Sequence, residues 1–401
     1  MATPPAFEAL KPDVLIKEET LPGYRAERYY PVTFGQVLND RYEVVAKLGY
    51  GTASTVWLCR DLFSPQDTPA FRALKVYVNS MKVHREVPIY SHLNNLSSEH
   101  PGPENVRKLH GVFEMEGPHG WHACLVHEAC GFDLDELKGF SPDGMYPADM
   151  LRHTMREVLN GLQFLHREAN VIHTDLRPDN ILTRVRHPVI FNRFETNENA
   201  APVPRKILED RTIYPSCRVP FTIAEYVISD LSEARLVDGS VNNDLIMPPV
   251  WRAPEVILCM PWSCPVDVWA FGLMVWYLFQ GSRLFRFSED GLEFSEEYHL
   301  AQMVAVLGPP PLDFLERSEH SWKYWNRDGT WRGDVPIPTD LSLESAEKRL
   351  KGEDKRLFLA WMRKMFQWKP EDRADCQDML FDDWLCADLL QSGEMERDGH
   401  E

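Results

Sequence analysis

Polar side chains crowd between two short apolar segments in the stretch VIHTDLRPDNIL, residues 171–182. Removing unpaired charges from water is costly, so a cluster of this kind requires either internal partners or a ligand. Asp175 can accept a proton from a hydroxyl nucleophile, Arg177 can neutralise a transferring phosphoryl group, and Asn180 can hold a divalent cation. Phosphoryl transfer depends mainly on positioning and charge neutralisation, and these residue types suit both requirements.

Other stretches supply groups that can bind phosphate and metal. Gly49 and Gly51 stand between two β-like segments, where glycine lets the backbone approach a ligand and offer N–H groups to phosphate. A plain hairpin would use the same glycines, so this pair alone is a weak signal. Lys75, in the apolar run ALKV, requires a counter-charge or an anionic ligand unless it faces solvent. Asp230 ends the apolar run VIS and can supply a carboxylate to Mg²⁺.

The first part of the chain has the texture of a β-sheet. Alternating residues predict three antiparallel strands between residues 41 and 78, in RYEVVAKL, STVWLCRD and ALKVYV. A helix is expected at 83–96, and a buried strand in CLVHEACG that runs into a connector. These strands would carry the two glycines and the lysine.

After residue 131 the periodicity becomes mostly helical. Apolar residues recur at helical spacing in ADMLRHTMREVLNGLQFLHREA. The run VWAFGLMVWYLF, residues 268–279, is too short to span a bilayer and predicts a buried core helix. Further helices are expected from Pro254 and in SEEYHLAQMVAVLG, EDKRLFLAWMRKMFQW and DCQDMLFDDWL. Residues 184–225 show no clear period and predict an irregular insert.

A small β-rich lobe therefore precedes a larger helical lobe, which defines an α+β chain. Its 401 residues are too many for one small core, in agreement with two lobes. The expected organisation is a lead-in at 1–40, a first lobe at 41–128, a second lobe at 129–390 and a loose tail at 391–401.

Composition limits the classes of partner and compartment. The net charge of -18 repels phosphate backbones, so direct binding to nucleic acid is not expected, whereas basic proteins or peptides are attracted. The eight cysteines form no C-x-x-C pair, which favours reduced thiols in the cytosol or nucleus. The N-terminal MATPPAFEAL has no feature of a signal peptide.

Taken in order, the motifs resemble the signature set of the protein kinases. They comprise the glycine loop at 49–51, Lys75, the pattern H-x-D-L-x-x-x-x-N at 173–180, Asp230, and Ala253-Pro254-Glu255. The resemblance covers about residues 30 to 390 and implies a bilobal protein-kinase fold, with a β-rich N-lobe and a helical C-lobe.

More narrowly, the chain resembles the SR-protein kinases of the CMGC group, in their filamentous-fungal branch. The supporting motifs are YYPV at 29–32, HTD in place of H-R-D at 173–175, WR at 251–252, VLGPPP at 306–311 and the insert PRKILEDRTIY. By the same resemblance, about residues 281–350 form the CMGC insert region.

The resemblance implies an ATP-binding set in the N-lobe. Gly49, Gly51 and Val56 would cover the ATP. Lys75 would hold the α- and β-phosphates and would pair with Glu86. The hinge would follow in the next strand.

In that hinge, the backbones of Glu128 and Cys130 would contact adenine, and His127 would occupy the gatekeeper position. Ser54 replaces the third glycine of the loop, which is common in this group. Pro88 follows Glu86 so closely that the helix is expected to begin near it or to bend.

The resemblance also implies the catalytic set. Asp175 would be the catalytic base, and Arg177, where the family usually has lysine, would touch the γ-phosphate. Asn180 and Asp230 would chelate Mg²⁺. Ser232 replaces the glycine of D-F-G, and the loss of glycine's conformational freedom predicts a stiffer segment.

A framework for a protein substrate accompanies this set. Glu255 would pair with Arg373, and Asp267 would orient the catalytic loop. This framework argues against a small-molecule kinase. Between Asp230 and Glu255 the only hydroxyl side chains belong to serine residues, Ser232 and Ser240, so a T-x-Y switch is absent and a constitutively competent loop is expected.

The predicted function is a serine/threonine protein kinase that transfers the γ-phosphate of ATP, with Mg²⁺, to Arg/Ser-rich proteins. The alternative is a pseudokinase that binds nucleotide or partners with weak or no transfer. We expect a cytoplasmic or nuclear monomer without direct nucleic-acid or membrane binding.

Overall fold

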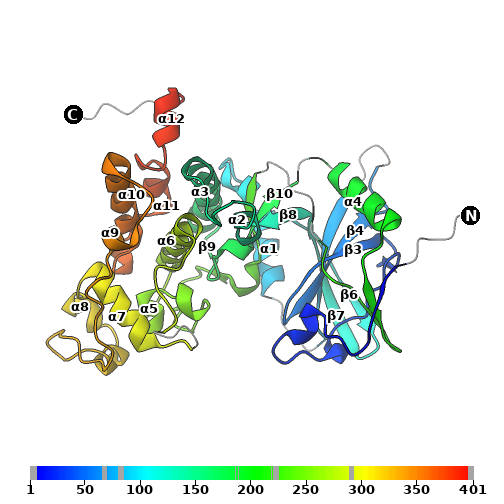
Figure 1. Cartoon of the computed structure of the whole chain (residues 1–401), viewed down its shortest axis with the longest axis horizontal. Coiled ribbons are helices and arrows are strands. Elements are labelled where there is room, and N and C mark those ends of the chain that lie inside the picture. Colours follow the sequence, from blue (N-terminus) through cyan, green and yellow to red (C-terminus); the bar gives the residue numbers. More distant parts are fainter. Residues whose placement is uncertain are drawn as a thin grey trace, which may run out of the picture. The chain divides into compact units, whose positions relative to one another are not determined.

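The computed structural model describes residues 7–65, 70–79, 85–185, 187, 189–217, 219, 225–288 and 293–395. The chain divides into two compact units. Unit 1 comprises Met1–Tyr90, Arg107–Phe132 and Leu182–Glu225, and unit 2 comprises Ser91–Val106, Asp133–Ile181 and Tyr226–Glu401. Unit 1 is built on a β-sheet and unit 2 is mainly helical (Figure 1). The predicted α+β class is confirmed.

A six-stranded antiparallel sheet forms the centre of unit 1, in the order β2-β3-β4-β5-β7-β6. Its strands are β2 (Val37–Leu38), β3 (Tyr42–Tyr50), β4 (Ser54–Asp61), β5 (Phe71–Tyr77), β6 (Leu109–Gly117) and β7 (Gly120–Glu128). The three predicted strands are β3 to β5, and the CLVHEACG strand is the end of β7. Strand β6 was not predicted, because glutamate and glycine weaken the β signal of LHGVFEMEG even though its burial alternates.

The sheet buries apolar side chains on both faces. One cluster includes Tyr42, Val44, Trp57 and Leu74, and the other includes Val45, Leu58 and Phe71. Alternation of side chains along each strand sends neighbouring residues to opposite clusters, as the burial of Val44 and Val45 shows. Burial on both faces makes the sheet a rigid support for the loops at its ends.

The insert 184–225 is neither irregular throughout nor part of the helical unit, and both expectations are corrected. It forms α4 (Val189–Ala200), β11 (Arg205–Ile207) and β12 (Thr212–Ile213), and residues 182–225 belong to unit 1. Figure 1 shows α4 beside β3 and β4, where Phe191 packs on Phe71 with ring centroids 5.4 Å apart. The helix escaped sequence analysis because polar residues fill most of its length, so it has no extended apolar stripe.

The lead-in is also part of unit 1. It contains β1 (Ala9–Leu10), which pairs in parallel with β11, and two short 3-10 turns, Lys17–Thr20 and Ala26–Arg28. Buried ion pairs fasten it: Glu18 contacts Lys47 of β3, and Glu19 lies 2.9 Å from the Lys206 ammonium. Because a buried charge is costly without its partner, the lead-in cannot leave this position without a large loss of free energy.

Helix α1 (Glu86–Asn95) begins at Glu86, and residues 83 and 84 of the predicted helix lie outside the described residues. Pro88 therefore falls in the first turn, where the missing N–H removes no intrahelical hydrogen bond. The expectation that the helix begins near this proline is confirmed.

Helices build most of unit 2, and the predicted helices are confirmed. The longer ones are α3 (Ala148–Gln163), which continues as a π-helical turn over Phe164–Glu168, α6 (Pro265–Gln280), α7 (Glu296–Leu307) and α10 (Gly352–Met365). Nearly all of α6 is buried, including Trp269, Phe271 and Trp276, so it is the axis of the core. Within the described ranges, no helix combines the length and apolar character needed to cross a membrane.

Shorter elements connect these helices. The helical ones are α2 (Leu134–Lys138), α5 (Pro254–Ile257), α8 (Leu312–Leu315), α9 (Leu343–Ala346), α11 (Cys376–Leu380) and α12 (Ala387–Ser392). The strands are β8 (Cys130–Asp133), β9 (Val171–Ile172), β10 (Ile181–Arg184), β13 (Tyr226–Ile228) and β14 (Arg235–Leu236). Strand β9, directly before the polar cluster noted above, pairs antiparallel with β14.

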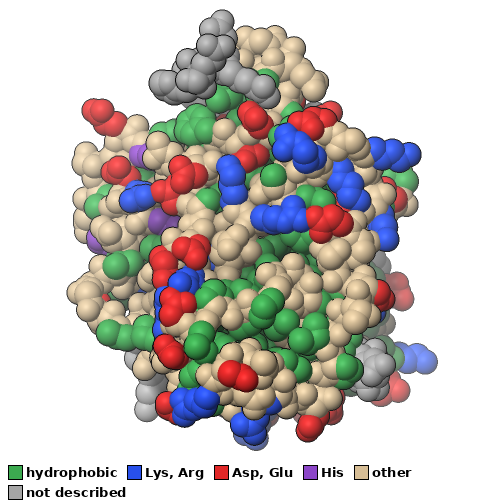
Figure 2. All heavy atoms as spheres, turned by 90° about the vertical axis from the view of Figure 1, so that its left-hand side faces the viewer, with side chains coloured by type: hydrophobic (Ala, Val, Ile, Leu, Met, Phe, Trp, Pro, Cys, Tyr) green, Lys and Arg blue, Asp and Glu red, His purple; other side chains and the backbone are tan. Residues whose placement is uncertain are grey.

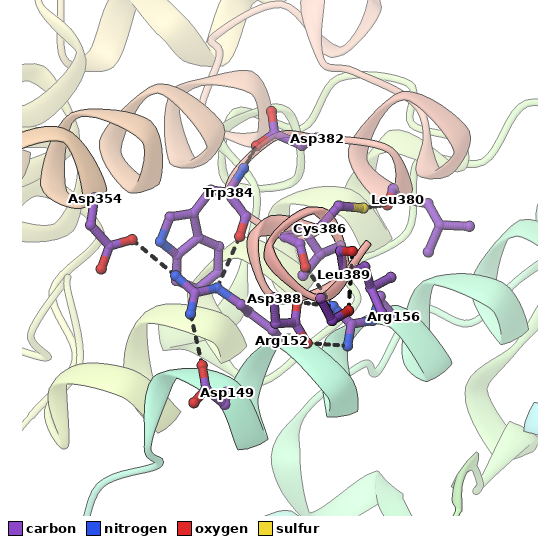
Figure 3. A network of polar contacts seen from close by, with 12 residues as sticks. Asp149, Arg152, Arg156, Asp354, Leu380, Asp382, Trp384, Cys386, Asp388 and Leu389 are labelled. Atoms are coloured by element: carbon purple, nitrogen blue, oxygen red, sulfur yellow. Dashed lines mark hydrogen bonds and ion pairs between the residues drawn. The ribbon is translucent and has the colours of Figure 1, made fainter. Parts of the chain in front are cut away.

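Two arginines of α3 anchor the C-terminal segment (Figure 3). Arg156 donates from both terminal nitrogens to the Asp388 carboxylate, each at 2.7 Å, and also to the Leu385 carbonyl. Arg152 donates to the Trp384 carbonyl at 2.9 Å and lies over the Trp384 ring. The tail is thus held as far as α12; its last residues, 396–401, lie outside the described part.

Replacement of Arg156 should release α12. In Arg156→Met, Asp388 and the Leu385 carbonyl lose their charged donor, and amide hydrogen exchange across Ala387–Ser392 should accelerate by roughly tenfold or more. Arg356→Met is the matched control, since Arg356 and Glu353 are 65% and 67% exposed. Equal exchange of α12 in both variants would show that the pair does not anchor the segment.

Candidate active site

One row of cross-strand neighbours runs through the sheet of unit 1. Gly49 pairs with Val56, Val56 with Lys75, and Lys75 with Leu125. His127 lies two residues beyond Leu125 and therefore faces the same side of β7. The residues predicted to cover and hold ATP are thus brought together by strand register, although they are far apart in the sequence.

The two glycines of the loop leave their backbone uncovered. Neither has a φ in the left-handed region, and a Cβ added at Gly49 or Gly51 would meet no atom within 4 Å. The fold itself therefore does not require glycine at these positions, and the open space beside their backbone would admit a closely approaching ligand. Position 54 does not require glycine either, because Ser54 is the first residue of β4 and a strand accommodates a side chain there.

Lys75 and Glu86 form a largely buried ion pair. The Lys75 ammonium lies 2.9 Å from Glu86 Oε2, and the glutamate side chain is 1% exposed. The Tyr77 hydroxyl also donates to this carboxylate, and His127 Nε2 lies 3.6 Å from its other oxygen. A buried carboxylate with these donors can hold the lysine ammonium in place for an anionic ligand.

The hinge backbone is already partly engaged within unit 1. The Glu128 carbonyl accepts from Arg107 Nε at 3.0 Å and from Nη2 at 2.9 Å, and the Glu128 side chain pairs with Arg184 at 2.8 Å. Cys130 begins β8, and its thiol lies 3.7 Å from the same carbonyl. A carbonyl oxygen has two lone pairs, so adenine would have to share the Glu128 oxygen with Arg107.

The catalytic loop of unit 2 brings together three predicted site residues. The Asn180 amide donates to the Asp175 carbonyl at 2.8 Å and to Asp175 Oδ2 at 3.0 Å. Arg177 lies 3.3 Å from Asp175 Oδ2 and 2.8 Å from Asp179. The spacing noted in the sequence thus produces one compact cluster.

One oxygen of that cluster stands out. Asp175 Oδ1 is buried and accepts no hydrogen bond from any described residue. Burial raises the pKa of Asp175, Arg177 opposes that rise, and the negative charge of Asp230 adds to it. A buried acceptor without a donor is rare, and a ligand hydroxyl would satisfy it.

Asp267 of α6 anchors the loop through hydrogen bonds to its backbone. Its fully buried carboxylate accepts the backbone N–H of His173 at 2.7 Å and that of Thr174 at 2.8 Å. His166 Nε2 completes the set at 2.9 Å from Asp267 Oδ2. Thr174 adopts a φ of 65°, a left-handed conformation that is strained for threonine, so these bonds hold the loop in a shape it would not adopt alone.

Asp230 directly follows Ser229, which is hydrogen-bonded to this loop. Both the N–H and the hydroxyl of Ser229 donate to the Asn180 carbonyl, at 2.8 Å and 2.9 Å. Asp230 itself has a φ of 59°, again left-handed, as is frequent at functional sites.

Asn180 and Asp230 provide too few ligands to hold a metal ion without further ligands from outside the protein. Among the described residues, no group of three or more histidine, cysteine, aspartate or glutamate side chains could hold a metal ion. Mg²⁺, however, commonly uses only one or two carboxylates and takes its remaining ligands from phosphates and water. The amide of Asn180 and the carboxylate of Asp230 fit an ion that arrives with a nucleotide.

The segment between Asp230 and Glu255 is tied down by contacts that need no phosphate. The Thr174 hydroxyl donates to the Glu233 carbonyl at 2.5 Å. Arg235 pairs with Asp244 at 2.6 Å. Ser232 lies in the 3-10 turn Leu231–Glu233 without a left-handed φ, so serine is accommodated there.

The predicted pair of Glu255 and Arg373 is present. Both terminal guanidinium nitrogens bond the carboxylate at 2.7 Å, and the two side chains are 1% and 0% exposed. Sequence reasoning missed Tyr77 and Arg107. Tyr77 could have been found, because it lies two residues after Lys75 on β5 and so shares its face, whereas no local pattern marks Arg107, which contacts a carbonyl 21 residues away.

Comparison with known proteins yields consistent matches. The protein kinase domain family matches residues 42–200 and 216–385. A serine/threonine protein kinase of Aspergillus fumigatus is 39% identical over 388 residues, 95% of this chain and 93% of the relative. The SRSF protein kinase 3 of Sus scrofa is 32% identical over 506 residues, 89% and 88% of the two chains. A crystal structure of a kinase domain superposes with a TM-score of 0.68 at 24% identity, covering 89% of this chain and 99% of that one, which supports the fold alone.

Loss of the buried guanidinium should strongly destabilise unit 2. Arg373→Met leaves the Glu255 carboxylate buried and unpaired, and we expect the free energy of unfolding to fall by about 3–5 kcal/mol in a denaturant titration. Arg327→Met is the control, because its pair with Glu319 is 69% and 85% exposed and should change stability by less than about 1 kcal/mol. A loss for Arg373→Met no greater than that of the control would contradict the structural role.

Proposed function

The chain belongs to the protein kinase family, in its SR-protein-kinase-like branch, and from this premise we propose that it transfers the γ-phosphate of ATP to serine in Arg/Ser-rich proteins. As a member of this family it is a protein serine/threonine kinase. The observation that carries the proposal is the buried oxygen Asp175 Oδ1, which accepts no hydrogen bond from the described residues. It lies in a loop whose backbone is hydrogen-bonded to the buried Asp267 carboxylate.

We assign the nucleotide to residues of unit 1. Lys75, held by Glu86, would bind the α- and β-phosphates under Gly49 and Gly51. The backbones of Glu128 and Cys130, with Val56 over the ring, remain the proposed partners of adenine. ATP supplies the phosphoryl group when bound with Mg²⁺.

We assign metal binding and the reacting groups to residues of unit 2. Asn180 and Asp230 would hold Mg²⁺, and Arg177 would neutralise charge on the γ-phosphate. Asp175 would accept the proton of the serine hydroxyl at Oδ1, and its raised pKa improves it as a base. Each of these roles is a proposal drawn from the family resemblance and supported by the local geometry.

The Arg/Ser preference rests on relatives and on charge. One relative of the chain is the serine/threonine-protein kinase SRPK of Physarum polycephalum, 29% identical over 390 residues. The net charge of -18 favours arginine-rich substrates. Figure 2 shows Lys and Arg as well as Asp and Glu on one face of the molecule, so the net charge does not make that face uniformly acidic. All eight cysteines are free thiols, which fits the proposed cytosolic or nuclear setting.

The alternative is a nucleotide-binding scaffold with weak or no transfer. Both functions require adenine to share the Glu128 carbonyl with the two hydrogen bonds from Arg107, so this contact does not separate them. The Asp175 cluster favours the active kinase, because a scaffold has no use for a base with an unsatisfied oxygen. The two functions differ in one assay of phosphate transfer.

Removal of the base should abolish transfer. With Mg–ATP and an Arg/Ser-repeat peptide, Asp175→Asn should lower kcat by at least about 100-fold, since a general base contributes 10²- to 10⁴-fold. Asp328→Asn, in an exposed turn, should behave as wild type. Equal labelling by wild type and Asp175→Asn would remove Asp175 from catalysis, and nucleotide binding without transfer by the wild type would establish the scaffold.

The tied activation segment should make activity independent of phosphorylation. Thr174 already bonds the Glu233 carbonyl, and Ser240 lies in an exposed turn capped by Asp238. We expect Ser240→Ala, and wild type treated with phosphatase, to retain kcat/KM within about twofold, because no contact of this segment requires a phosphate. A large loss of activity in either sample would establish a phosphorylation switch.

A further inference from the structure

Tyr29 connects the lead-in to the tip of the glycine loop. Its hydroxyl donates to the Gly51 carbonyl at 3.0 Å and to the Thr52 carbonyl at 3.3 Å. The side chain is only 7% exposed. Tyr29 lies outside the matched kinase domain, which begins at residue 42, so the contact is contributed by a segment that precedes the domain.

Tyr29 is itself firmly placed. It follows the 3-10 turn Ala26–Arg28, and its own carbonyl accepts from Arg211 of the insert at 3.3 Å. Arg211 also donates to the Ala26 carbonyl. Asn79, just after β5, donates its N–H to the Arg28 carbonyl at 3.0 Å. Contacts from two distant segments therefore fix the position of the Tyr29 hydroxyl.

The hydroxyl determines the direction of two peptide groups. A trans peptide is planar, and its N–H points opposite to its C=O. When the Gly51 and Thr52 carbonyls turn toward Tyr29, the N–H groups of Thr52 and Ala53 turn away from it. Neither N–H donates to another group in the described part of the chain. The loop therefore presents two unsatisfied donors on the side opposite Tyr29.

We propose that Tyr29 is a positioning residue for nucleotide binding, which holds the Gly51 and Thr52 carbonyls so that the Thr52 and Ala53 N–H groups face the ATP phosphates. This inference rests on the proposed function, because ATP is the phosphate-bearing ligand. A flexible glycine loop has many conformations, and ordering it beforehand lowers the entropy lost on binding. The lead-in thus takes part in substrate binding and is more than a connector.

The test compares two neighbouring tyrosines. Tyr29→Phe deletes only the hydroxyl that reaches the loop. Tyr30→Phe is the matched control, because the Tyr30 hydroxyl accepts from Gln36 at 3.1 Å and, unlike that of Tyr29, does not hydrogen-bond Gly51 or Thr52. Both changes keep the aromatic ring, so both proteins should fold, and the melting temperature of each is measured first.

Four quantities are measured on the full chain. Without nucleotide, exchange of the Gly51 N–H, which donates to the Ser54 carbonyl at 2.8 Å, should be roughly 3- to 10-fold faster in Tyr29→Phe than in wild type, the range expected for one lost hydrogen bond. The Kd for Mg–ATP from calorimetry, and the KM for ATP, should each rise by a similar factor. We expect kcat to stay within about twofold, since Tyr29 touches no reacting group, and Tyr30→Phe should match wild type throughout.

Each outcome decides the proposal. Unchanged loop exchange and Kd in Tyr29→Phe, or equal changes in Tyr30→Phe, would overturn it. A wild type that binds Mg–ATP without transfer would refute the proposed kinase activity, yet the exchange and Kd comparison would still decide the role of Tyr29. A wild type that binds no Mg–ATP would overturn both proposals.

Discussion

The active-site geometry depends on one buried carboxylate, that of Asp267. It lies on the central helix α6 and accepts two consecutive backbone N–H groups of the catalytic loop together with a histidine. Charge-assisted bonds in a water-free core are strong, and they hold Thr174 in its left-handed conformation. With that residue fixed, Asp175 and Asn180 follow within six residues, so the core of unit 2 determines the position of the proposed catalytic groups.

Unit 1 uses the same physical device for a different purpose. Glu86 is a second buried carboxylate, and it holds the Lys75 ammonium at a defined point on the sheet. Strand register then places Gly49 and Val56 in line with that lysine. In both units an expensive buried charge is satisfied by several donors and fixes the position of a predicted site residue.

Sequence reasoning predicted the grouping of candidate site residues that lie in short motifs. Asp175 and Asn180 cluster because five residues of chain bring them together, and the alternation of β3 to β5 predicted the strands that carry Lys75. It failed where position depends on distant segments. Arg107 reaches the hinge from the segment that precedes β6, and nothing in its neighbours marks it. Helix α4 escaped notice because it lacks an extended apolar stripe and packs through few residues.

The most direct test of the central claim is the turnover rate of Asp267→Asn. The amide keeps the shape of the carboxylate but replaces one acceptor with a donor that faces the N–H groups of the loop. Because a displacement of about 1 Å can cost 10²-fold in rate, we predict that kcat for an Arg/Ser-repeat peptide falls about 100-fold or more in a protein that still unfolds cooperatively. A folded Asp267→Asn protein with the kcat of wild type would contradict the account.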